Sequence, residues 1–324
     1  MAATLTSKRY QVPDVADAIE FCFQQGWTDG LPVVPPTPDR VSAMLDAARL
    51  EAQQQVAFII NRAVSVTAEK VAINAVMAGC KPEYMPLVVA AVEGIGDPQW
   101  SYHGPGTSTG GAAVLMIVNG PIARELEINA GDNLFGPGWR ANLNRGTLGH
   151  PGKVSYVIAE NEPDSPWTPL HVERGFSPGQ STVTVMAAES PHQFYNQLSN
   201  TPEGVLTTLA DAMRLGGSAG RQPQYVIVLA GEHMRTIGHS GWGKKEIRQF
   251  LFEHTQNSHA HLKRTNRLPG AIQPGDETKL RPLVASADDI LVVAAGGRAG
   301  AFSAFIPGWG GSRSSLAVTK EVRR

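Results

Sequence analysis

The chain has 324 residues, and its 28 Lys and Arg nearly balance its 29 Asp and Glu, for a net charge of −1. This balance, without basic or acidic blocks, argues against nucleic acid or a charged membrane surface as a partner. The sequence contains no apolar run of about 18 residues, so it predicts no transmembrane helix, and its first residues lack the apolar core of a signal peptide. With two cysteines it has no disulfide framework, and we expect a cytoplasmic protein.

The first hundred residues predict a mainly helical region. Apolar residues at three- and four-residue spacing mark the helices, and Thr37 or Asp39 and Thr67 are suited to cap two of them. We expect helices over residues 14–26, 37–54, 67–79 and 82–95, and a strand over 56–60.

From residue 112 onward, apolar strand patterns alternate with helical patterns, which is typical of an α/β fold with helices flanking the sheets. We expect strands over 112–118, 154–159, 182–188, 225–230 and 290–295, and helices over 202–215 and 243–256. The sequence predicts two α/β lobes, residues 1–175 and 176–324, with glycine-rich loops at strand ends; one composite domain is the alternative.

An internal similarity favours two related half-domains. An apolar run precedes Phe135 to Trp139 (FGPGW), and another precedes Phe305 to Trp309 (FIPGW). Because open α/β sheets bind ligands in the loops at their strand ends, the repeat predicts a small-molecule site between two similar lobes. The alternative is that each copy is only a tight turn with a packed tryptophan.

Cys80 is the first candidate for chemistry. It lies between two predicted helices, beside Lys81 and before Pro82, and both a helix N-terminus and a lysine favour the thiolate. We therefore expect a nucleophile or redox thiol, with a buried small apolar residue as the alternative. Cys22 lies on the apolar stripe of the first predicted helix and is expected to be core.

A second candidate is a group of carboxylates and a histidine. A strand ends at Glu160 and Glu162, and a proline-rich return leads to His171 and Glu173. Such groups perform acid–base catalysis, or Glu160, Glu162 and His171 could hold a divalent metal, although the spacing matches no strict metal motif. The alternative is a solvated, salt-bridged loop with a structural histidine.

Two glycine-rich stretches are candidates for binding an anion. Residues 100–111 place His103, a possible general base, before Ser108 and Thr109, whose hydroxyl and amide groups could bind an anion; a flexible surface loop is the alternative. Gly296 and Gly297 follow a strong strand, but no acidic ribose partner follows, so no nucleotide cofactor motif is found. Further substrate-binding candidates are Trp27, Asp29, Asn119, Trp139, Arg140, Arg174 and Trp309.

Five longer motifs carry a resemblance to a known family. They are WTDGLPVVPPT (27–37), AVMAGCKPEY (75–84), NGPIA (119–123), FGPGWRAN (135–142) and SPWTPLHVERGF (165–176). The chain resembles bacterial proteins that are associated with small proteins carrying a U/C-G-S-C motif, where U is selenocysteine. The resemblance implies thiol-type, redox or bond-cleaving chemistry on a small molecule, with such a thiol or selenol protein as a partner.

The chain departs from that family after FGPGWRAN. Family members carry a longer, helix-like segment there, whereas here Asn144 is followed directly by Arg145. This indicates either a deletion or a segment left out of the numbering, and the second would mark a lid beside the site.

Three functional hypotheses follow. The first is an enzyme that cleaves a carbon–heteroatom bond of a small anionic substrate, by elimination, hydrolysis or thiol-assisted reduction, using Cys80 and the Glu/His group. The second is a metal-dependent hydrolase or lyase in which Cys80 is structural. The third is a non-catalytic binding subunit of a two-component system. In each case we expect a homo-oligomer.

Overall fold

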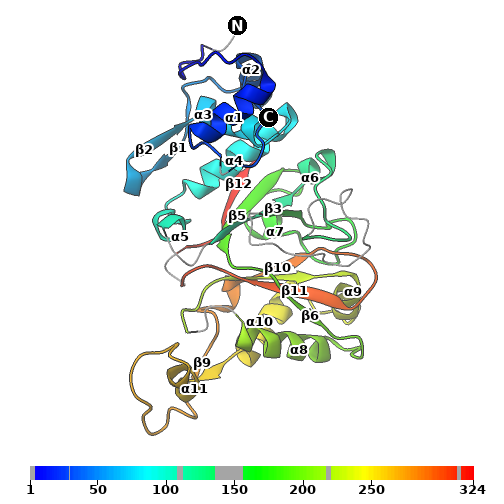
Figure 1. Ribbon diagram of the computed structural model, residues 1–324. Helices are drawn as coiled ribbons and strands as arrows, with labels where there is room; N and C mark the ends of the chain where they lie inside the picture. The colour runs from blue at the N-terminus through cyan, green and yellow to red at the C-terminus, as the bar shows by residue number, and fades with distance from the viewer. Residues whose placement is uncertain (1–3, 29, 108–111, 136–155, 217–219, 312–314) are drawn as a thin grey trace. The chain divides into compact units, whose positions relative to one another are not determined.

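The computed structural model describes residues 4–28, 30–107, 112–135, 156–216, 220–311 and 315–324 (Figure 1). The chain forms two compact units, one of Met1–Asp97 with Lys320–Arg324 and one of Pro98–Thr319. With 36% helix and 19% strand in several mixed sheets flanked by helices, the fold is α/β, which confirms the predicted class. Within the described ranges, none of the helices has the length and apolarity needed to cross a membrane.

The smaller unit is mainly helical. In chain order it contains α1 (Val15–Gln24), α2 (Pro38–Ala48), β1 (Gln55–Ile59), η1 (Ile60–Arg62), β2 (Val64–Thr67), α3 (Ala68–Met77), η2 (Pro82–Tyr84) and α4 (Met85–Ile95). Strands β1 and β2 pair in an antiparallel hairpin, while α2, α3 and α4 enclose the core of the unit. The expected helix over 37–54 ends earlier, because Arg49 takes a left-handed conformation (φ 55°) that stops it.

A buried carboxylate anchors the N-terminal segment of this unit. Glu69, on α3, is 1% exposed and accepts hydrogen bonds from the backbone amides of Thr6 and Ser7 at 2.9–3.1 Å. Burial alone would raise its pKa, but these hydrogen bonds outweigh burial and lower the pKa to about 2.

The larger unit carries the remaining elements. In chain order they are α5 (His103–Thr107), β3 (Ala113–Asn119), α6 (Pro121–Glu125), β4 (Tyr156–Ala159), α7 (Leu170–Glu173), β5 (Thr182–Ala188), β6 (His192–Tyr195), α8 (Pro202–Leu215), β7 (Tyr225–Leu229), α9 (Gly231–His239), α10 (Lys244–His254), β8 (Asn257–Ser258), α11 (His259–Arg264), β9 (Leu280–Arg281), η3 (Ala287–Asp289), β10 (Ile290–Ala294), β11 (Phe302–Pro307) and β12 (Val318–Glu321). The last two residues of β12 belong to the smaller unit.

Two four-stranded sheets organise this unit, with strand orders β12-β5-β3-β4 and β10-β7-β11-β6. Each sheet contains a parallel pair, β3 with β4 and β7 with β10, and β3 also pairs antiparallel with β5. Because parallel strands end at the same edge of a sheet, the residues that follow each pair are brought together.

The two sheets pack face to face, and helices cover the outer face of the second one. Alternate residues of β7 divide between two cores: Tyr225, Ile227 and Leu229 pack with α8, α9 and α10, whereas Val226 and Val228 pack against the other sheet. Figure 1 shows α8 and α10 along the β10-β7-β11-β6 sheet. This arrangement explains why β7 and β10 are apolar on both faces.

Two predictions about organisation differ from the structure. The division into units does not fall at residue 175, because β5 pairs with β3 across that point in one sheet. In the second FxPGW copy, Phe305 to Pro307 belong to strand β11 rather than to a turn. In the first copy, residues 136–139 lie outside the described residues, so the comparison of the two copies stays a prediction.

Candidate functional site

A pocket of about 380 Å³ opens at the carboxyl ends of β7 and β10. Three strand ends supply its walls, since Gly231 follows β7, Gly296 follows β10 and Asn161 follows β4. Backbone hydrogen bonds hold these ends: Asn161 donates to Ala294, the last residue of β10, at 2.7 Å, and Gly296 donates to Ala130, in the segment after α6, at 2.9 Å. The pocket is therefore built on rigid elements, where α/β folds place their ligands.

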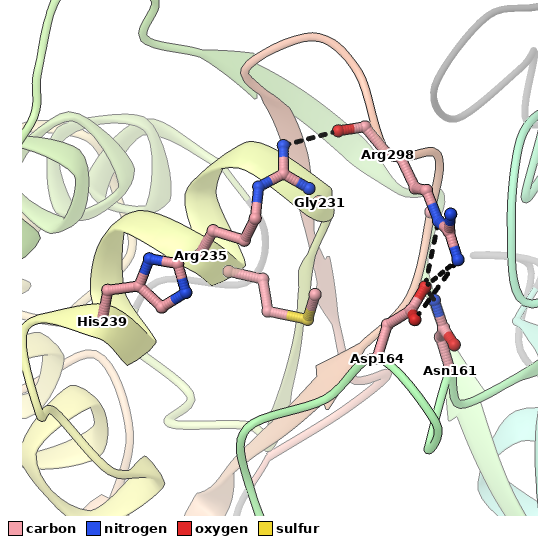
Figure 2. Close-up of a pocket in the computed structure, with 8 residues that line it drawn as sticks. Asn161, Asp164, Gly231, Arg235, His239 and Arg298 are labelled. Atoms are coloured by element: carbon pink, nitrogen blue, oxygen red, sulfur yellow. Dashed lines mark hydrogen bonds and ion pairs between the residues drawn. The ribbon is translucent and has the colours of Figure 1, made fainter.

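One wall of the pocket is a stripe along α9. Gly231, Arg235 and His239 are spaced four residues apart, so their side chains share one face of the nine-residue helix. Figure 2 shows the guanidinium of Arg235 reaching toward the loop that carries Arg298. One of its N–H groups donates to the carbonyl oxygen of Arg298 at 2.8 Å, and a guanidinium has five N–H donors.

The opposite wall carries a paired acid and base. Arg298 donates from Nε and Nη2 to the two carboxylate oxygens of Asp164, at 3.2 and 3.4 Å, and Asn161 donates to Asp164 at 3.1 Å (Figure 2). The Asn161 hydrogen bond, with Arg298 beside it, lowers the pKa of Asp164 below its ordinary value of 3.8. Two guanidinium groups against one carboxylate leave an excess of positive charge on the pocket walls.

The start of α9 approaches the Arg298 loop too closely for any side chain. A Cβ on Gly231 would lie 2.6 Å from the Arg298 Cα and 2.7 Å from the carbonyl oxygens of Gly297 and Arg298. The Gly231 amide also donates to the Gly297 carbonyl at 3.0 Å. Glycine is thus required where the helix and the loop form the base of the pocket.

Behind the pocket, a buried histidine fixes the first turn of α9. His233 is 2% exposed, and its two ring nitrogens lie 2.8 Å from Ser303 Oγ and 3.1 Å from the Asn196 carbonyl. Ser303 Oγ in turn accepts from the Ala230 amide at 3.0 Å. Burial lowers the pKa of His233, so the neutral imidazole donates to Asn196 and accepts from Ser303.

A second polar group lies at the carboxyl ends of β3 and β4, and we call it the inner cluster: Asn119, Glu160, Glu162, His171, Glu173, Thr182, Lys244 and Arg248. Glu160 is its centre. This 4% exposed carboxylate accepts from Asn119 Nδ2 and the Leu170 amide, both at 2.7 Å, and from Lys244 Nζ at 3.2 Å.

Two further carboxylates complete the ion pairs of the inner cluster. Glu173 accepts from Lys244 at 3.1 Å and from Arg248 at 2.8 Å. Glu162 accepts from the Gly120 amide at 2.8 Å and from Asn119 Nδ2 at 3.0 Å, and its Oε1 lies 3.8 Å from His171 Nδ1. The structure thus brings together the four predicted residues Glu160, Glu162, His171 and Glu173.

These contacts bear on the predicted metal site. Glu160 uses both carboxylate oxygens for three hydrogen bonds, which leaves it a poor metal ligand. Among the described residues, no three His, Cys, Asp or Glu side chains gather so that they could hold a metal ion. The arrangement instead suits an ion-paired anchor between β4, α7 and α10.

Cys80 lies in the smaller unit, directly after α3. Its side chain is half-buried, and burial raises the pKa of its thiol. Burial thus opposes the expected shift toward thiolate, and the Nζ of Lys81 lies 3.9 Å from Glu83 Oε1. A role for Cys80 in the reaction stays a prediction.

The other predicted residues are dispersed. Trp27, 47% exposed, lines a second pocket of about 610 Å³ in the smaller unit. In the larger unit His103 begins α5, and Trp309 packs on Gly104 of that helix. Burial lowers the pKa of Arg174. Its guanidinium donates to the Ala317 carbonyl, directly before β12, and to the Thr319 hydroxyl in β12, so Arg174 stabilises the sheet. Asp29, Ser108, Thr109, Trp139 and Arg140 lie outside the described residues.

Sequence reasoning identified one of the two glycines that line the pocket at the ends of β7 and β10 but missed Gly231 and most of the polar side chains. Gly296 lines the pocket, and Gly297 supports it through the hydrogen bond to Gly231. Asp164, Arg235 and His239 were not singled out. The sequence contains a signal for these residues. Gly231, Arg235 and His239 recur every four residues, about one helical turn, directly after an apolar strand pattern.

Comparisons with models of protein families, with curated proteins and with solved structures found no match to this chain.

Proposed function

We propose that the chain is an enzyme that acts on a small anionic molecule bound in the pocket at the ends of β7 and β10. The observation that carries this proposal is the arrangement of Arg235 and Arg298 around a cavity of about 380 Å³. A cavity of this size suits a small metabolite, and a guanidinium is the side chain best adapted to carboxylate and phosphate.

The pocket also supplies groups for proton transfer. His239 and Asp164 line it, and an imidazole is the side chain most used as a general acid or base near neutral pH. We therefore favour elimination or hydrolysis at a carbon–heteroatom bond, with an arginine holding the anionic group. In this version the Glu/His group predicted from sequence does not react but holds the strand ends in place.

Anion binding is the first test. The purified protein is titrated calorimetrically with inorganic phosphate and with a small dicarboxylate, and Arg235→Gln is compared with Arg214→Gln, an exposed arginine paired with Asp211 on α8. Loss of one charge-assisted hydrogen bond should weaken binding by about tenfold in the first variant only. Equal affinities in both variants, or no binding to wild type, would contradict the proposal.

A screen of small anionic compounds for turnover tests the catalytic part. With any substrate found, His239→Gln should lower kcat with little change in KM, because it removes a proton donor and leaves the arginines. If the variant keeps full kcat, His239 is not the acid or base.

The raised pKa of Cys80 favours a second candidate, a binding subunit of a two-component system. At neutral pH a thiol with a raised pKa holds little thiolate, so this chain would depend on a reactive thiol or selenol from elsewhere. The partner would be a small protein with a U/C-G-S-C motif. Turnover of a bound anion only after such a protein is added would favour this candidate over the first.

A further inference from the structure

Four polar atoms in the inner cluster make no hydrogen bond with any described residue. They are Asn119 Oδ1, Thr182 Oγ1 and both ring nitrogens of His171, and all three residues are 0% exposed. Buried polar groups in folded proteins are nearly always paired with protein or with ordered water. Four such atoms in one region therefore require an explanation.

The four atoms belong to neighbouring side chains. Asn119 and Thr182 face each other at the end of the β3–β5 ladder, where opposite side chains are adjacent. Asn119 and His171 both approach Glu162 Oε1, at 3.0 and 3.8 Å. The orientation of the Asn119 amide is fixed, because its NH₂ group donates to Glu160 and Glu162, so its oxygen is directed away from them.

The chemistry of these atoms selects the occupant. The Asn119 oxygen only accepts, an imidazole carries at least one N–H donor, and the Thr182 hydroxyl both donates and accepts. A bare cation would leave the imidazole N–H unpaired. An anion would be repelled by the Asn119 oxygen and by Glu162. A small neutral molecule that donates and accepts satisfies all of them, and water is such a molecule.

We propose that Asn119, His171 and Thr182, beside Glu162, form a buried hydration site in which ordered water bridges β3, β5 and α7. The water supplies the partners that the three side chains lack. It also supports Glu162, which lies in the same short loop as Asn161 and Asp164 of the pocket. The site thus contributes to the position of the pocket wall, and it stands whether or not the pocket binds an anion.

Two threonines of β5 provide a matched test. Thr184, two residues from Thr182 and equally buried, has a partner, since its Oγ1 lies 2.8 Å from Thr319 Oγ1. Thermal unfolding is measured on metal-stripped protein for Thr182→Val and Thr184→Val. If water occupies the site, both variants lose a hydrogen bond, and both midpoints should fall by roughly 2–4 °C. If Thr182 is truly unpaired, its replacement should leave the midpoint unchanged or raise it, which would overturn the proposal.

Two measurements on the wild-type protein keep the test decisive if a variant does not fold. Magnetisation transfer from water to the Thr182 methyl and His171 ring resonances is expected at the site, and its absence would count against bound water. Elemental analysis of the wild-type protein tests whether a metal ion, rather than water, occupies the site. One equivalent of a metal ion that resists dialysis and stabilises the wild-type protein but not Thr182→Val would also overturn the hydration site.

Discussion

The two parallel strand pairs of the larger unit end in opposite ways. At the ends of β3 and β4, the buried Glu160 is paired with the buried Lys244, and the more exposed Glu173 pairs with Lys244 and Arg248. At the ends of β7 and β10, an arginine-lined pocket remains open, and its carboxylate Asp164 pairs with an exposed Arg298. The same feature of the fold, polar residues after parallel strands, gives an anchor in one place and a ligand site in the other.

One loop connects the two regions. Glu160 and Glu162 turn into the inner cluster, whereas Asn161 and Asp164 line the pocket. The carboxylates predicted to react, Glu160 and Glu162, are thus hydrogen-bonded within the inner cluster, and their neighbours Asn161 and Asp164 face the cavity. A carboxylate already hydrogen-bonded by buried donors serves position better than chemistry, because any reaction there would first have to break those contacts.

The largest effect should come from breaking the ion pairs of the inner cluster. Lys244→Met leaves Glu160 buried without a cation, and removal of one partner of a buried pair typically costs 3–5 kcal/mol, so the free energy of unfolding should fall by about that amount. Urea unfolding measures it. Lys245→Met, at the exposed neighbouring position, is the control and should change stability by less than about 0.5 kcal/mol. Similar losses in both variants would show that Glu160 does not depend on Lys244.

A smaller effect is expected at the base of the pocket. Gly231→Ala places a methyl group against the backbone of Gly297 and Arg298, and overpacking of this kind costs roughly 1–3 kcal/mol. The displaced loop should also weaken phosphate binding, which calorimetry would detect. Gly179→Ala, where nothing lies within 4 Å of the new methyl, is the control. Unchanged stability and affinity in Gly231→Ala would mean that the loop moves away from the new methyl group with no loss of unfolding free energy or of phosphate binding.

The smallest expected effect is an increase in phosphate affinity. Asp164→Asn frees Arg298 from its carboxylate partner, so phosphate affinity should rise by about threefold, in keeping with the modest energy of an exposed ion pair. Asp211→Asn, which breaks the exposed pair with Arg214, is the control and should leave affinity unchanged. A fall in affinity would show that Asp164 helps to bind the anion.

The pH dependence of that gain follows from the pKa of Asp164. Because its folded pKa lies below 3.8, Asp164 stays charged across pH 5–8, and its own ionisation adds no pH dependence to the difference between variant and wild type there. The difference should disappear only as the pH falls through that lowered pKa, where the wild-type carboxyl group also becomes neutral.

The sequence predicts the strands and helices with strong local patterns. The expected strand over 182–188 and helix over 202–215 match β5 and α8 in both bounds, because one is rich in β-branched and apolar residues and the other has a regular apolar stripe. Strand β11 was missed, since Phe302 to Pro307 mixes serine and proline with apolar residues and lies between glycine-rich segments. Its strand character comes from pairing with β6 and β7, which a local pattern does not reveal.

In the candidate site, too, the contacts between residues close in sequence could be predicted and the long-range contacts could not. Glu160, Glu162, His171 and Glu173 are close in sequence, so their proximity could be predicted. Lys244 is 84 residues from Glu160, and this long-range pairing decides that the group is an anchor. The hydrogen bonds that fix Asp164 beside Arg298 span 134 residues. Such distances are set by the packing of two sheets, and one sequence holds no signal for them.

The smaller unit is assembled from both ends of the numbered chain, with Lys320 donating to Asp97 at 2.8 Å and Arg323 pairing with Glu93. The larger unit is thus an insertion between two parts of the smaller one. During synthesis on the ribosome, residues 1–97 emerge long before residues 320–324. The smaller unit therefore cannot be completed until the whole larger unit has been synthesised. Folding of the two units is therefore coupled in time, even though each has its own core.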